Sequence, residues 1–111
     1  MSVTLGIYKG KDYGNSEFID DIPVSFASTW SKVWSKALTE CDIKKFRICN
    51  YFPIKDVPTV LEELDRIYEW VQNNGGKYTE YISRRIRDQL KPFLIQFYQE
   101  HIDEDYWFDV G

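Results

Sequence analysis

The chain has 111 residues, of which 43% are hydrophobic and 17% aromatic, and its formal net charge is −4. The length is close to the commonest size of one domain and the apolar content is ample for a core, so we expect a single globular domain over residues 1–111 rather than a disordered chain. The acidic balance disfavours nonspecific binding to nucleic acid or to an anionic membrane, because both depend on lysine and arginine.

The N-terminal third predicts a strand, a loop and a helix. Apolar and polar residues alternate over residues 3–8, which is the pattern of a half-buried strand. Residues 9–23 are rich in turn formers and predict a structured loop in which Phe18 and Ile19 dip into the core. From Ser25, a suitable N-cap, hydrophobic residues recur every three or four positions and predict an amphipathic helix.

The middle of the chain predicts a second strand and a second helix. Residues 46–52 alternate until Pro53, which ends the strand. An apolar stripe over residues 57–71 predicts a helix that begins near Asp56 and stops at residues 73–75. Its outer face is expected to be acidic and carries Glu62, Glu63, Asp65, Arg66 and Glu69.

The C-terminal third predicts a third helix and a third strand. The helical pattern runs from Thr79 to His101, and Pro92 within it predicts a kink or a break at Lys91. Residues 106–110 alternate and predict a short strand. The order of elements predicts an α+β fold, a small three-stranded sheet with about three helices packed on it.

The last eleven residues are the strongest candidate for a partner-binding segment, because they combine four carboxylates with three consecutive aromatic residues. Interfaces concentrate binding energy in Tyr and Trp, and carboxylates at the rim select a positively charged partner. If Tyr106, Phe108 and Val110 face the core, the residues between them face the other side of the strand. The candidate partner-binding residues are Asp103, Glu104, Asp105, Trp107 and Asp109, together with Glu62, Glu63, Glu69 and Trp70 on the second helix.

No catalytic, metal or cofactor motif is evident, and we expect neither an enzyme nor a bound cofactor. His101 is the only histidine and has no second ligand at metal spacing. The aspartates at 103, 105 and 109 lack the glycine and the glutamate of a calcium loop. A basic face of Arg84, Arg87 and Lys91 is either a solvated helix face or a site for phosphate or an acidic protein surface.

The two cysteines, Cys41 and Cys49, form no CxxC pair. They predict two reduced, mostly buried thiols in a cytoplasmic protein, with a disulfide between them as the less favoured alternative. No stretch approaches the roughly 18 apolar residues of a transmembrane helix, so no membrane span is expected.

The layout resembles that of the immunity proteins of bacterial polymorphic toxin and contact-dependent growth inhibition systems. The features shared are small size, acidity, a first strand over residues 3–8, a loop over residues 14–17 that leads to Phe18, and a helix that bears Trp30 and Trp34. The resemblance covers roughly the first seventy residues. It implies an inhibitor that binds a cognate toxin domain, and many such toxins are nucleases whose basic clefts an acidic protein complements.

Two other functions stay open at this point. One is a regulatory or adaptor domain that docks on another protein or homodimerises through Trp70. The other is a small enzyme that acts through Asp or Glu with Arg84 or Arg87 binding an anionic substrate, which requires these groups to converge in a pocket.

Overall fold

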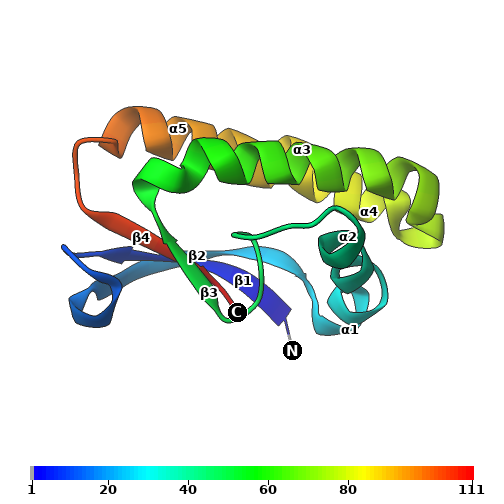
Figure 1. The fold of residues 1–111 in the computed structure, drawn as a ribbon, viewed down its shortest axis with the longest axis horizontal. Coiled ribbons are helices and arrows are strands. Elements are labelled where there is room, and N and C mark those ends of the chain that lie inside the picture. The colour runs from blue at the N-terminus through cyan, green and yellow to red at the C-terminus, as the bar shows by residue number, and fades with distance from the viewer. Residues whose placement is uncertain (1) are drawn as a thin grey trace.

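The computed structural model describes residues 2–111, which form an antiparallel sheet covered on one face by helices (Figure 1). The strands are β1 (Ser2–Lys9), β2 (Glu17–Phe26), β3 (Asn50–Pro53) and β4 (Tyr106–Val110), and they lie in the order β2-β1-β4-β3. The α+β class is confirmed. The sheet has four strands rather than the three predicted, and the additional strand is β2.

Strand β2 lies mostly in the segment that was predicted to be a loop. It pairs with β1 along the whole of its length, from Ser2↔Phe26 to Lys9↔Glu17. Two register shifts interrupt this pairing, so β2 lacks the simple alternation by which a strand is recognised in a sequence. The expectation that Phe18 and Ile19 enter the core is wrong, because they are 54% and 49% exposed.

The first helix begins later than predicted, because Ser25 and Phe26 belong to β2. It comprises α1 (Ala27–Thr29), a π-helical segment at Trp30–Trp34 and α2 (Ser35–Glu40). Strand β3 is likewise shorter than the predicted strand over residues 46–52. Phe46 lies in the connection that precedes β3, and its side chain is buried.

The two cysteines differ from expectation in their burial. Cys41 is half-buried and Cys49 is exposed, and both thiols are free. The prediction that both are mostly buried is therefore wrong for Cys49. This residue has a positive φ of 64°, in the connection that leads into β3.

The remaining helices form an antiparallel pair. One is α3 (Val57–Asn74), which matches its predicted range, and the other consists of α4 (Thr79–Arg84), a π-helical segment at Arg85–Leu90 and α5 (Lys91–His101). Pro92 does not split this second helix. The helix changes from π-helical to α-helical at Lys91, one residue before the proline. The wider π-helical turn accommodates Pro92, which has no N–H to donate.

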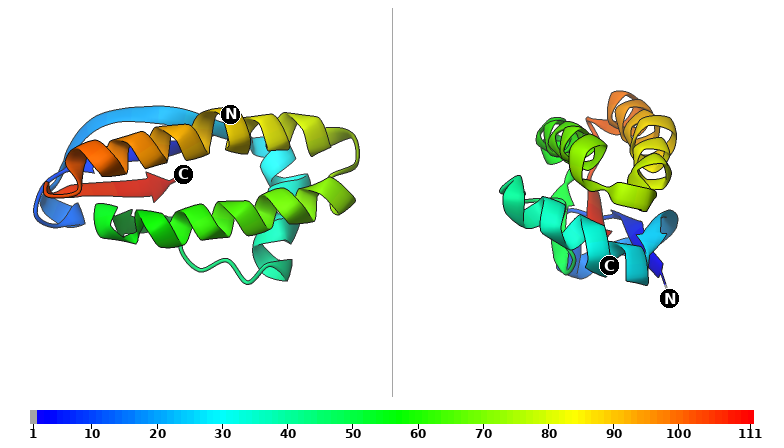
Figure 2. Two further views of the ribbon diagram at one scale, coloured as in Figure 1. Left: turned by 90° about the horizontal axis from the view of Figure 1, so that it is seen from above. Right: turned by 90° about the vertical axis from the view of Figure 1, so that its right-hand side faces the viewer.

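The helix pair lies along one face of the sheet, and α2 packs at one end (Figures 1 and 2). Tyr106, Phe108 and Val110 of β4 are buried beneath it, as their alternation predicted, whereas Trp107 and Asp109 point to the opposite face. We call that opposite face, which the helices do not cover, the open face. The apolar core beneath the helices includes Leu5, Ile7, Val24, Phe52, Val60, Leu64, Ile67, Ile86, Leu90 and Leu94.

Candidate functional site

Five aromatic rings from all four strands and one loop meet on the open face. Tyr8, Tyr51 and Trp107 each alternate with a buried neighbour, as Tyr51 does with Phe52. Cross-strand pairing sets Tyr8 opposite Trp107 on one side and opposite Phe18 on the other. Tyr13 reaches across from the loop between β1 and β2. We call this group the open-face cluster, and its members are Tyr8, Tyr13, Phe18, Tyr51 and Trp107.

The rings of the cluster fix one another in place. Tyr13 and Tyr51 are stacked, with centroids 4.2 Å apart and planes 4° from parallel. Trp107 meets the Tyr51 ring edge to face at 5.8 Å, and Tyr8 meets Tyr13 in the same way at 5.3 Å. Stacked and edge-to-face geometries are the favoured ones for aromatic pairs. The cluster is therefore preorganised, although Tyr51 and Phe18 are each more than half exposed.

Asp109 lies at the centre of this cluster. The Tyr13 hydroxyl donates a hydrogen bond of 2.7 Å to Asp109 Oδ2. This bond, followed by burial, raises the pKa of Tyr13 well above 10, and burial followed by the same carboxylate raises the pKa of Tyr8. Both phenols consequently stay protonated, and the carboxylate is held in one orientation rather than swinging freely in solvent.

Gly6 makes room for this carboxylate. It lies opposite Asp109 in the pairing of β1 with β4, and a Cβ atom at Gly6 would come within 2.4 Å of Asp109 Oδ1. Any side chain at this position would displace the carboxylate or push the strands apart. The glycine is thus required by close approach rather than by an unusual φ.

The acidic turn of Asp103, Glu104 and Asp105 lies beside the cluster. Glu104 accepts hydrogen bonds from His101 Nδ1 at 2.6 Å and from Lys9 Nζ at 3.4 Å, and the His101 bond chiefly lowers the Glu104 pKa. All three acidic residues are exposed. Residues of the turn and Trp107 line a common hollow of about 310 Å³, whose lining includes Lys11, Pro53, Lys55, Glu104, Asp105 and Trp107.

A second hollow, of about 360 Å³, lies on the other side of the cluster. Tyr13, Tyr51 and Asp109 form part of its wall, with Cys49 and Asn50 beside them. The Asp109 carboxylate is therefore reachable from solvent while the Tyr13 hydroxyl orients it. Such a site can receive a cationic side chain, which gains from the carboxylate and from the faces of the neighbouring rings.

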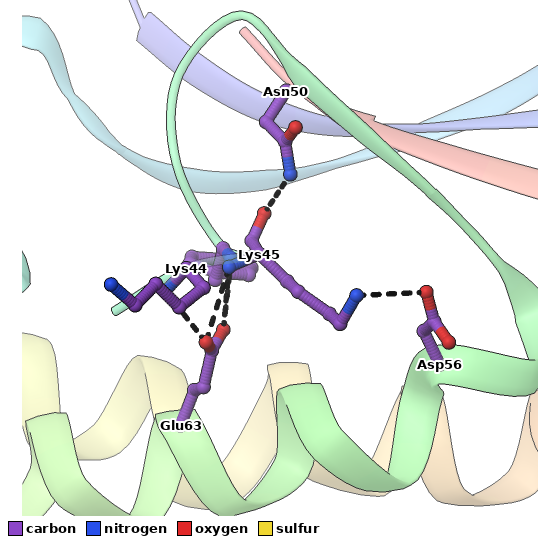
Figure 3. Close-up of polar contacts among 6 residues, drawn as sticks. Lys44, Lys45, Asn50, Asp56 and Glu63 are labelled. Carbon is purple, nitrogen blue, oxygen red and sulfur yellow. Dashed lines mark hydrogen bonds and ion pairs between the residues drawn. The ribbon is translucent and has the colours of Figure 1, made fainter. Parts of the chain in front are cut away.

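Glu63 was predicted to lie on the outer face of the second helix, and this placement is wrong. Its side chain is only 1% exposed, and its carboxylate accepts hydrogen bonds from the backbone N–H groups of Lys44, Lys45 and Phe46 (Figure 3). The Lys44 and Phe46 bonds measure 2.8 and 2.9 Å. Glu63 therefore holds the connection before β3 against α3 and is not available to a partner.

The other predicted residues of α3 lie apart from the tail. Glu62 and Glu69 are exposed, and Trp70 is half-buried with its indole N–H donated to Glu40 at 3.3 Å. Helix α3 covers the inner face of the sheet, whereas Trp107 and Asp109 belong to the open face (Figure 1). The structure thus divides the candidate residues between two surfaces. A partner-binding role for Glu62, Glu69 and Trp70 stays a prediction.

The basic face of the last helix is neutralised by neighbouring acids. Arg84 pairs with Glu80 at 2.7 Å, Arg87 pairs with Asp88 at 2.8 Å, and Lys91 pairs with Asp65. These pairs favour the interpretation of a solvated helix face over that of a phosphate site. Within residues 2–111, no group of His, Cys, Asp and Glu is placed to hold a metal ion, and no helix is long and apolar enough to cross a membrane.

Comparison with known proteins leaves the open face as the principal guide to function. The chain matches no protein-family model, no curated protein and no solved structure. Sequence reasoning identified Trp107 and Asp109 but missed the rings of Tyr8, Tyr13, Phe18 and Tyr51. Tyr8 and Tyr51 carried a usable signal, since each is adjacent to a buried strand residue, whereas nothing in the turn-rich sequence around Tyr13 points to its role.

Proposed function

We propose that this chain is a binding protein that docks a basic surface of another protein on its open face, and that it serves as an immunity protein by neutralising a cognate bacterial toxin domain in this way. The observation that carries the proposal is the Asp109 carboxylate, oriented by a tyrosine hydroxyl within an exposed and mutually packed set of aromatic rings.

The open-face cluster has the physical properties of a binding hot spot. Binding energy concentrates in Trp, Tyr and Arg near the centre of an interface, and rings that are already ordered lose little conformational entropy on binding. Trp107 and Tyr51 also present ring faces to which a partner's arginine or lysine is attracted. The acidic turn lies at the rim, where charge steers association and selects the partner more than it adds affinity.

The toxin as partner is supported by two observations from the sequence. The first is the layout shared with immunity proteins, and the second is the excess of twelve acidic over six basic residues in the second half of the chain. A nuclease binds polyanionic substrate through lysine and arginine, so an acidic protein that covers those residues blocks the enzyme. We therefore propose a basic toxin surface, such as a nuclease cleft, as the target.

Co-expression tests this proposal. The proposal expects a toxin gene beside this gene, and the absence of such a gene would refute the immunity function. Cells that produce that toxin should survive when they also produce the unaltered chain, and they should lose protection with Trp107→Ala or Asp109→Ala. Glu69→Ala removes an exposed carboxylate from α3 and should protect fully, so it controls for net charge. Equal protection by all variants would refute the role of the open face, and failure of the unaltered chain to protect would refute the immunity function.

A further inference from the structure

Strand β2 forms one edge of the sheet, and its first five residues are exposed, whereas Val24 and Ser25 near its end are buried. It pairs with β1 on one side only, and it runs along the outside of α5 when the molecule is seen from above (Figure 2). An edge strand directs the N–H and C=O groups of every second residue away from its neighbour, where another strand can pair with them. The opposite edge, β3, is a strand of only four residues.

The two ends of β2 differ in how this edge is protected. Pro23 has no N–H to donate, and its carbonyl oxygen accepts a hydrogen bond of 3.2 Å from the Arg85 guanidinium. The segment from Glu17 to Ile22 has no proline and no contact with the helices of this kind, although Ile19 is the extra residue of a register shift and the Asp21 N–H donates to Asp20 Oδ1 at 2.8 Å. Every residue of this segment except Ile22 is exposed. The accessible edge is therefore the N-terminal half of the strand.

The side chains of this half combine acidity with exposed apolar surface. It carries Glu17, Asp20 and Asp21 and no basic residue, and none of these carboxylates is ion-paired within residues 2–111. Phe18 is 54% exposed and packs edge to face on Tyr8 at 5.6 Å. Through this contact the edge is continuous with the open-face cluster, so one partner can reach both.

We propose that the free edge of β2, from Glu17 to Ile22, accepts an extended basic strand of the partner protein, which lengthens the sheet by one strand. Main-chain hydrogen bonds would hold such a strand, and its lysine or arginine side chains would face the carboxylates of β2. The identity of the occupant rests on the proposed function, because it takes the partner on the open face to be basic.

The same charges exclude a second copy of this chain. In an antiparallel pairing of two copies along this segment, the carboxylates of Glu17, Asp20 and Asp21 of one copy would face those of the other. Like charges directly opposite each other repel, whereas lysine at those positions would attract. The acidic edge thus selects against self-association and for a basic strand.

A charge-reversed copy of the chain serves as the probe. Glu17→Lys, Asp20→Lys and Asp21→Lys in one chain convert its edge into the basic strand that the proposal requires. Mixed with the unaltered chain in equal amounts, it should form a heterodimer in analytical ultracentrifugation, while each chain alone stays monomeric. In the mixture, amide hydrogen exchange at Phe18 to Ile22 of the unaltered chain should slow at least tenfold.

The matched control reverses three exposed carboxylates of the helix layer instead, with Glu62→Lys, Glu69→Lys and Glu100→Lys. This variant has the same net charge and should not associate with the unaltered chain. Equal association by both variants would show attraction by bulk charge alone and would overturn the proposal, as would the absence of association by either. Neither result would refute the proposed function of the open-face cluster, because no residue of that cluster is changed.

A peptide replaces the reversed chain if that chain does not fold. The hexapeptide Lys-Phe-Ile-Lys-Lys-Ile and its backbone N-methylated form carry the same side chains, but only the first can pair with a strand edge. The first should shift the amide resonances of Glu17 to Ile22 and the second should bind at least tenfold more weakly. Equal binding, or binding by neither, would overturn the proposal.

Discussion

Replacing Glu63 tests whether a buried carboxylate holds the connection before β3. Glu63→Ala leaves three backbone N–H groups, those of Lys44, Lys45 and Phe46, without their acceptor. A hydrogen bond to a charged group contributes roughly 1.5–3 kcal/mol, and a buried donor left unsatisfied costs a similar amount. Water can reach the first two groups once the side chain is gone, whereas the Phe46 bond is buried. We therefore expect a total loss of about 3 kcal/mol.

A loss of this size is a large part of the roughly 5–15 kcal/mol by which a small domain is stable. At about 4 °C per kcal/mol for a chain of this length, thermal unfolding followed by circular dichroism should shift down by roughly 12 °C. Glu63→Gln keeps one acceptor oxygen and should lose about half as much, because its amide group cannot accept all three bonds.

Glu62→Ala is the matched control, since Glu62 is the neighbouring residue on α3 and is exposed. Its effect should stay within about 0.5 kcal/mol, as is usual for a surface substitution. Equal shifts for Glu62→Ala and Glu63→Ala would refute the reasoning, because the difference between the two residues rests on burial and on the three accepted bonds.

Three further substitutions test the geometry of the open face and the acidic turn. Gly6→Ala should destabilise the protein by roughly 1–3 kcal/mol in urea unfolding, because its Cβ would meet the Asp109 carboxylate, and an unchanged midpoint would contradict that close approach. Asp109→Asn should lower the pKa of Tyr13 toward 10 in an ultraviolet titration. The stability linked to this raised pKa is complete below about pH 10 and is lost as the pH rises toward the folded-state value, so the unaltered chain should lose more stability than Asp109→Asn over that range. His101→Leu should raise the pKa of Glu104 toward 4.5 in an NMR titration. Because the Glu104 pKa is lowered in the fold, its contribution to stability is present above pH 4.5 and is lost as the pH falls through the folded-state value, and an unmoved Glu104 titration would contradict the His101 contact.

The elements that could be predicted from the sequence are those with an uninterrupted period. Helix α3 buries one continuous stripe, and β4 alternates strictly, so both match expectation. Strand β2 was missed because two register shifts and a run of turn-forming residues obscure its alternation. It is also an edge strand with an exposed first half, which leaves few buried residues to reveal it.

The open-face cluster could be predicted only in part for a related reason. The alternation of β4 is local, so it places Trp107 and Asp109 on the face away from the core. Contacts with Tyr8 and Tyr51 depend on the strand order, and no local pattern specifies which strands lie beside β4. Similarly, the burial of Glu63 depends on a connection that lies seventeen to nineteen residues earlier in the chain.

The central claim is that the open face, rather than α3, binds the partner. Calorimetric titration of the chain with the toxin domain against which it protects in co-expression tests this claim most directly, with Trp107→Ala compared against Trp70→Ala. Both indoles are half-buried, so the two substitutions are matched in kind. A hot-spot tryptophan contributes about 2 kcal/mol or more, so Trp107→Ala should weaken binding roughly thirtyfold, while Trp70→Ala should change it less than about threefold. A large loss for Trp70→Ala with none for Trp107→Ala would contradict the claim and would assign binding to the helix layer.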